Sequence, residues 1–107
     1  MQEYQPSQIT QLGVLGSGTP NPDPLRSGPS FLLRVEGVPY IFDFGPGLIR
    51  RAAGFSSRYG GDWGNFQLRD LSQAFLSHLH ADHTAGLPDL ILTPWIMGRD
   101  KALQIWG

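Results

Sequence analysis

The chain has 107 residues, of which 40% are hydrophobic and 11% aromatic, so it suits one globular domain with a modest core rather than a disordered chain. Eight basic and nine acidic residues give a net charge of -1, which indicates neither a nucleic-acid footprint nor a membrane surface. The chain has no cysteine, which excludes disulfides, thiolate nucleophiles and cysteine-based zinc sites.

The first half of the chain is predicted to form strands and one short helix. Alternating apolar residues predict a strand over 9–15, and four prolines in 20–29 predict a loop. Two further strands, over 31–35 and 40–44, flank a hairpin turn that contains a glycine and a proline. A short helix is predicted over 48–53, just after a proline.

The second half alternates between strand and helix patterns. We expect an irregular loop over 54–65, a strand over 71–77, a helix over 84–97 that bends or ends near Pro94, and a strand over 102–106. The helix is predicted to bury one face that carries Leu87, Leu90, Ile91 and Ile96.

A strand, a crossover helix and another strand form a βαβ unit, which predicts an α/β fold with a mixed sheet and covering helices. In such sheets ligands collect at the carboxyl ends of strands. No apolar run reaches the length of a membrane span, and residues 1–11 are too polar for a signal peptide. We therefore expect no membrane partner and favour a cytoplasmic location.

All three histidines of the chain lie within the segment SHLHADHTAGLP, over 77–88. If the segment is extended, His78 and His80 point to one side and Leu79 faces the core. Asp82 and His83 follow as the chain turns into the helix, so they are expected to reach a second position nearby. Imidazole and carboxylate ligands suit zinc, and also iron or manganese.

Two other interpretations of these histidines need weighing. A lone histidine is more often a structural or surface residue than a ligand, and a histidine tract can also be an exposed tag. The interleaved Leu79 and Ala81, and the apolar segments on both sides, argue against a tag. Three histidines and an aspartate in one HxHxDH pattern favour a metal site.

Three motifs together carry a family resemblance. Residues 77–88 resemble the histidine motif of the metallo-β-lactamase superfamily, and within it the branch of ribonuclease Z, arylsulfatase-like and phosphodiesterase-like hydrolases. The segment LGSGTP at 15–20, with the proline-rich loop after it, is similar to that branch's first strand and turn. The segment FDFGPG at 42–47 resembles the family's early aspartate motif.

The resemblance implies a metallo-β-lactamase αββα sandwich, of which residues 1–107 would be the N-terminal portion of a single domain. It implies two Zn²⁺ ions per complete site, with Mn²⁺ or iron as substitutes. His78 and His80 would belong to the first metal, and Asp82 and His83 to the second. Asp82 would also act as the catalytic proton acceptor or orient the attacking water. Asp43 would hold the histidine segment in place; its other interpretation is an ordinary strand-end or helix-capping aspartate.

The sequence also departs from the family pattern. The family takes further ligands from its second half, but no histidine follows His83, so each metal would have only two ligands from this chain. Half a sandwich also leaves an apolar sheet face and an open edge. We therefore expect self-association, or a partner chain that supplies the missing half. Trp95, Ile96 and Trp106 are candidates for such a surface, although core packing is favoured for each.

The sequence thus predicts a metal-dependent hydrolase that cleaves phosphodiester or sulfate ester bonds, with a metal-bound hydroxide as nucleophile. Its substrate would be a small-molecule ester or RNA. The alternative is a catalytically incomplete fragment that binds metal or oligomerises. Arg26, Arg50 and Arg51 could contact a phosphate or sulfate, but solvated surface charge is favoured for each.

Overall fold

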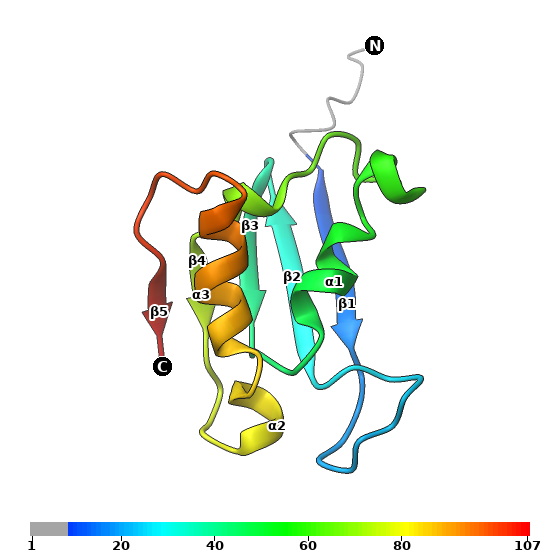
Figure 1. Ribbon diagram of the computed structural model, residues 1–107. Coiled ribbons are helices and arrows are strands. Elements are labelled where there is room, and N and C mark those ends of the chain that lie inside the picture. The colour runs from blue at the N-terminus through cyan, green and yellow to red at the C-terminus, as the bar shows by residue number, and fades with distance from the viewer. Residues whose placement is uncertain (1–8) are drawn as a thin grey trace.

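The structure, a computed structural model, describes residues 9–107 and contains one five-stranded sheet (Figure 1). The strand order follows the chain, β1-β2-β3-β4-β5. The first three strands pair antiparallel, and β3, β4 and β5 pair parallel, so the predicted mixed sheet is confirmed. The strands are β1 (Thr10–Gly16), β2 (Ser30–Val35), β3 (Val38–Phe42), β4 (Gln73–Phe75) and β5 (Gln104–Trp106).

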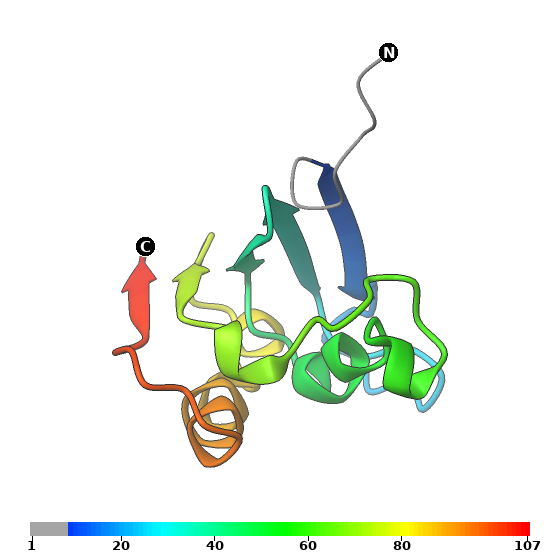
Figure 2. The same ribbon diagram turned by 90° about the horizontal axis from the view of Figure 1, so that it is seen from above.

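All helices lie on one side of this sheet (Figure 2). The crossover between β4 and β5 consists of a short helix and a longer one, as the βαβ pattern predicts. Across residues 9–107 no helix is long and apolar enough to cross a membrane. The helices are α1 (Leu48–Ala53), α2 (Ala81–Thr84) and α3 (Leu87–Ile96), with 3₁₀ turns η2 (Ser57–Tyr59) and η3 (Leu68–Asp70).

Backbone geometry explains why strand β3 is shifted from its predicted range of 40–44. Glu36 and Gly37 both have positive φ and form a two-residue turn between Val35 and Val38, which is the tight hairpin geometry that matches strand twist. The strand therefore starts earlier than predicted and includes Pro39. It ends at Phe42 because the next residue, Asp43, has φ +63° and leaves the extended conformation.

The hydrophobic core lies between the sheet and its helices. Inward side chains of the strands pack against α1 and α3 in one contiguous cluster. The cluster consists of Leu15, Leu32, Ile41, Phe44, Leu48, Ile49, Ala52, Trp63, Phe66, Leu71, Ala74 and Leu90. It forms one layer of helices on one layer of sheet, which matches the expected half of a four-layer sandwich.

The segment 54–65 is more ordered than the expected irregular loop. Trp63 is buried, stacks on Phe55 with ring centroids 4.5 Å apart, and meets Phe66 edge-on at 5.7 Å. Phe55 lies directly over Gly13 of β1, where a Cβ would come within 2.5 Å of its ring. These aromatic contacts fix the segment on the sheet, which the glycine and serine content of the sequence did not indicate.

One expectation for α3 is wrong. Ile91 and Ile96 are exposed, the latter by 74%, so only Leu90 of the expected face is fully buried. The helix ends at Ile96, just after the buried Pro94, so the predicted end near Pro94 is confirmed. Pro94 has no N–H for the Leu90 carbonyl, and the Arg99 guanidinium donates to that carbonyl instead, at 3.2 Å, and to the Ile91 carbonyl.

The sheet face without helices carries a row of apolar side chains. Register pairs Val14 with Phe31, Phe31 with Phe42, Phe42 with Phe75, and Phe75 with Trp106, so the row crosses all five strands. The rings of the last three stack at 5.1 Å spacing. We call these five residues, of which all but Val14 are aromatic, the aromatic row. The row confirms the expected apolar sheet face.

The three candidates for a surface position are exposed, and the favoured core role is wrong for each of them. Trp95 and Ile96 are on the outward side of α3, and Trp106 ends the aromatic row on edge strand β5. Trp95 is 63% exposed. Burial of Trp95 and Ile96 would need a further layer of protein against α3. Burial of Trp106 would need one against the sheet face without helices.

Candidate metal centre

The histidine segment lies where two neighbouring parallel strands end. Phe42 ends β3 and Phe75 ends β4, and the two residues pair in register. Asp43 follows β3 directly, while Ser77 and the three histidines follow β4. The chain then enters α2, whose N-cap is His80. The site therefore occupies the carboxyl end of the parallel part of the sheet, where ligands bind in α/β folds.

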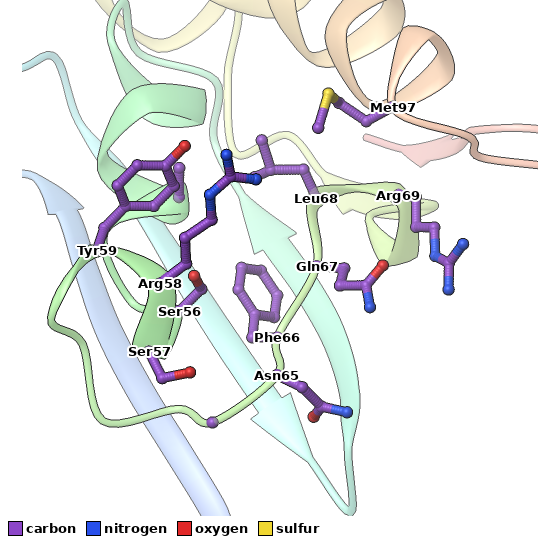
Figure 3. A pocket seen from close by; sticks show the side chains of 12 residues that line it. Ser56, Ser57, Arg58, Tyr59, Asn65, Phe66, Gln67, Leu68, Arg69 and Met97 are labelled. Carbon is purple, nitrogen blue, oxygen red and sulfur yellow. The ribbon is translucent and has the colours of Figure 1, made fainter.

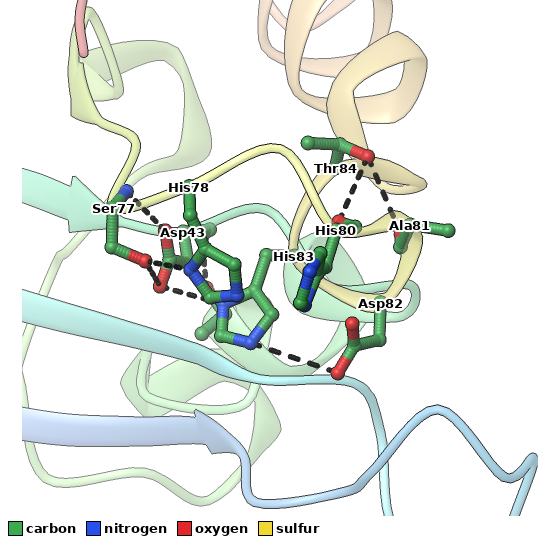
Figure 4. A network of polar contacts seen from close by, with 9 residues as sticks. Asp43, Ser77, His78, His80, Ala81, Asp82, His83 and Thr84 are labelled. Atoms are coloured by element: carbon green, nitrogen blue, oxygen red, sulfur yellow. Dashed lines mark hydrogen bonds and ion pairs between the residues drawn. The ribbon is translucent and has the colours of Figure 1, made fainter.

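Asp43 is the central acceptor of this region (Figure 4). One carboxylate oxygen accepts the Ser77 backbone N–H at 2.7 Å. The other lies 2.7 Å from the Ser77 hydroxyl and 2.8 Å from His83 Nδ1. The left-handed backbone of Asp43, rare for a residue with a side chain, is held by a hydrogen bond from the Ser30 hydroxyl to its carbonyl.

Asp43 is buried, with only 8% of the residue exposed. Burial by itself raises its pKa, but hydrogen bonds from the Ser77 backbone and side chain and from His83, together with the His83 charge, outweigh burial and hold the pKa below the ordinary 3.8. The ionised carboxylate is an acceptor only, so Nδ1 of His83 carries the proton in this contact.

Ser77 extends the same arrangement to His78. Because its hydroxyl donates to Asp43, the Ser77 oxygen is left to accept the proton on His78 Nδ1, 2.8 Å away. Nδ1 is thus the protonated nitrogen of both His78 and His83. In the neutral form of each ring Nε2 keeps its lone pair, and Nε2 is the nitrogen that a metal ion binds when Nδ1 is hydrogen-bonded.

The three imidazoles lie side by side. Ring centroids are 4.6 Å apart for His78 and His80 and 4.1 Å apart for His78 and His83. Asp82 Oδ2 lies 3.6 Å from His83 Nε2. The structure therefore brings together the four residues that the resemblance implies as ligands, with Asp43 behind them (Figure 4).

These donors suit a divalent ion in kind, but their arrangement is incomplete. Imidazole nitrogen and carboxylate oxygen are the ligands that zinc, manganese and iron accept. Within the part of the chain that the structure describes, no group of three or more histidine, aspartate or glutamate side chains is arranged so that it could hold a metal ion. The residues fit such an ion by their chemistry, but the described part of the chain does not arrange enough of them to hold it.

The expected burial of Leu79 is wrong, since this side chain is 82% exposed. The expectation assumed a strand from 71 to 77 that continued as extended chain through the first two histidines. β4 in fact ends at Phe75, so the alternation of strand side chains does not reach Leu79. The contact between the rings of His78 and His80 arises in the turn into α2.

Sequence reasoning missed the roles of Ser77 and Gly86. Ser77 connects Asp43 to His78, and the only sign of this role in the sequence was its position directly before the HxH pattern. Gly86 donates its N–H to the Phe44 carbonyl at 2.6 Å, and a Cβ there would lie 2.5 Å from the Gly45 carbonyl oxygen. The Phe44 N–H in turn donates to the His83 carbonyl, so the backbone after β3 holds α2 in place.

A cavity of about 680 Å³ opens beside His80 and Asp82. The proline-rich loop forms its other side, from Thr19 to Gly28, and this loop includes the exposed Arg26. The loop is held by the Gly18 N–H, which donates to Ser27, and by the Gly28 N–H, which donates to Pro46. Arg50 and Arg51 do not line this cavity; Arg51 is 3.3 Å from the Ser27 hydroxyl.

Comparisons with known proteins agree on one family. A family model described as "Metallo-beta-lactamase superfamily" matches residues 23–98. Ribonuclease Z of Mycobacterium marinum is 40% identical over 102 residues, which cover 92% of this chain and 33% of that protein. Ribonuclease Z of Mycolicibacterium paratuberculosis is 40% identical over 88 residues, which cover 82% of this chain and 28% of that protein.

Solved structures give the same result. The short form of human tRNase Z matches with a TM-score of 0.71 and 28% identity, over 91% of this chain and 34% of that one. A metallo-beta-lactamase fold protein of Bacillus subtilis matches with a TM-score of 0.71 and 20% identity, over 92% of this chain and 37% of that one, a likeness of fold alone. The chain spans about a third of the length of the curated relatives it matches. This chain belongs to the metallo-β-lactamase superfamily, and its named relatives include ribonuclease Z proteins.

Proposed function

We propose that this chain is part of a metal-dependent hydrolase that cleaves phosphodiester bonds in RNA. The observation that carries the proposal is the hydrogen-bond chain from Asp43 through Ser77 to His78, and from Asp43 to His83, which leaves Nε2 free on both rings. Ligand histidines are commonly oriented in this way. Membership of the superfamily implies divalent metal binding, and zinc is the favoured ion.

In this proposal His78 and His80 hold one ion, and Asp82 and His83 hold the other. A bound divalent ion supplies charge stabilisation and lowers the pKa of water. Asp43 acts behind the ligands as a positioning residue, since its carboxylate is used by Ser77 and His83. Asp82 is the candidate proton acceptor, because its carboxylate borders the cavity and lies close to His83.

The cavity beside His80 and Asp82 is the candidate substrate space. It is large enough for a nucleotide and its phosphate, and the Arg26 guanidinium is suited to a phosphate oxygen. RNA is favoured over a small ester because the relatives carry the names ribonuclease Z and tRNase Z. A sulfate ester has no such support among these relatives and serves as the comparison substrate.

The remaining ligands would come from a further layer of protein against the aromatic row. Sheet-on-sheet packing buries such a face and completes the sandwich. A second candidate function is a catalytically silent fragment that binds metal or oligomerises. The oligomerising form of this candidate is favoured by the finding that no three acidic or histidine side chains in residues 9–107 are arranged to hold an ion.

Elemental analysis of the purified chain, with its mass in solution, tests the proposal. We expect one or two tightly held divalent ions per chain in an associated state, and loss of metal in His80→Ala. Asp100→Asn is the matched control, because Asp100 is exposed and distant in sequence from the histidines. Turnover of bis(p-nitrophenyl) phosphate and an RNA oligonucleotide, with none of p-nitrophenyl sulfate, would support the hydrolase. Bound metal without turnover, or a metal-free chain that self-associates, would support the silent fragment. A folded, metal-free chain would contradict the hydrolase proposal.

A further inference from the structure

A second cavity lies away from the histidines, on the helix side of the sheet. Its volume is about 410 Å³, within the range of small-molecule sites, and it shares no lining residue with the cavity beside His80. The segment 56–69 forms most of it, and Met97 at the end of α3 completes it. This segment and α2 lie at opposite ends of the molecule (Figure 1).

The lining of this cavity is basic. Arg58 and Arg69 both contribute to it, whereas no aspartate or glutamate does. Over the described range 9–107, neither arginine has an ion-pair partner. An arginine fork without a carboxylate partner is suited to bind phosphate oxygens. The charge of the cavity therefore favours an anionic ligand.

Flat apolar groups and hydrogen-bonding groups also line the cavity. Tyr59 is exposed with the Arg58 guanidinium 5.5 Å from its ring centre, and Phe66 forms a buried wall. In the view of Figure 3, Tyr59 and Met97 lie on opposite sides, with Phe66 between them. The amides of Asn65 and Gln67 also line the cavity. Aromatic rings and guanidinium planes stack with bases, and amides pair with base edges.

The site is also held in shape before any ligand binds. The Ser57 N–H donates to the Gly64 carbonyl at 2.8 Å, which closes the segment on itself. Phe66 is anchored from behind by its edge-on contact with Trp63. A preformed site loses less conformational entropy on binding than a flexible one.

We propose that this cavity binds a single nucleotide, with its base against Tyr59 and Phe66 and its phosphate on Arg58. The nucleotide is either free or an unpaired residue of an RNA chain, and only the second case rests on the proposed function. Binding here needs no metal and no histidine, so it can be tested apart from hydrolysis.

The test is titration of the isotope-labelled full chain by NMR in EDTA, with 5′-AMP, adenosine, inorganic phosphate and a short unstructured oligoribonucleotide in separate arms. We expect 5′-AMP to shift amide signals over 56–69 and at Met97, and to bind at least about tenfold more tightly than adenosine or phosphate, because each lacks one half of the contacts. If the oligoribonucleotide binds more tightly than 5′-AMP, the site is assigned to RNA. If 5′-AMP binds more tightly, the site is assigned to a free nucleotide.

Variants separate this site from general charge effects. Arg58→Gln and Tyr59→Ala are each expected to weaken 5′-AMP about tenfold, and both residues are exposed, so the fold should persist. Arg50→Gln is the matched control, since Arg50 is exposed on α1 and lines neither cavity. The proposal is overturned if phosphate binds as tightly as 5′-AMP, if Arg50→Gln weakens binding equally, or if only signals near His80 shift. Because EDTA removes metal, failure of the hydrolase proposal leaves these outcomes unchanged.

Discussion

The two faces of the sheet differ although the same strands build both. On the helix side, Leu32 of β2 is fully buried in the core. On the other side, its neighbour Phe31 is 41% exposed in the aromatic row. Both are large apolar residues, so the hydrophobicity of a side chain does not decide its burial; the presence of a covering layer does.

The largest expected effect is on the free energy of unfolding, compared between two neighbouring residues of β2 that lie on opposite faces of the sheet. Leu32→Ala should lower the free energy of unfolding by about 2–5 kcal/mol, because it opens a cavity in a packed core. Phe31→Ala, one residue away, should cost less than about 1.5 kcal/mol if its face is bare. Urea unfolding of both variants measures the difference. Equal losses would mean that the aromatic row is covered in solution.

A smaller effect on the free energy of unfolding is expected at Asp43, a buried residue that directly follows β3. Asp43→Asn keeps the shape but removes the charge that Ser77 and His83 contact, and should lower the free energy of unfolding by about 1–3 kcal/mol. Asp62→Asn, at an exposed aspartate, should change it by less than about 0.5 kcal/mol. Chemical denaturation of the two variants decides the matter, and a neutral Asp43→Asn would remove the basis for its positioning role.

The smallest effect on folding is expected on the bare face, where the readout is association. The double variant Phe31→Ser with Trp106→Ser should shift the free energy of unfolding by roughly 1 kcal/mol, since both side chains are partly exposed. It should also reduce self-association, measured by sedimentation at several concentrations. Leu25→Ser is a suitable control, because Leu25 is exposed in the proline-rich loop away from the sheet. Unchanged association would exclude the aromatic row as the contact surface.

The same two faces explain which predictions were right. The mixed sheet, the βαβ crossover and the short helix at 48–53 followed from periodicity and from glycine and proline positions, which act over a few neighbouring residues. The buried segment around Trp63 did not, because its burial depends on Phe55 and on the space over Gly13. The errors at Leu79, Ile91 and Ile96 have a similar origin, since each assumed a local period where the covering layer decides exposure. The prediction that residues 1–107 belong to a single domain remains open, and residues 1–8 lie outside the described range.

By itself the sequence determined the identity and spacing of the HxHxDH segment, the aspartate at the end of the second hairpin strand, and hence the family. These are properties of short motifs, which depend only on the types and spacing of neighbouring residues. Only the tertiary structure decided that Asp43 contacts both Ser77 and His83, residues far from it in the chain. These contacts decide that Nδ1 of His78 and of His83 carries a proton. The tertiary structure also decided the register that aligns the aromatic row, because strand pairing joins residues that no local pattern relates.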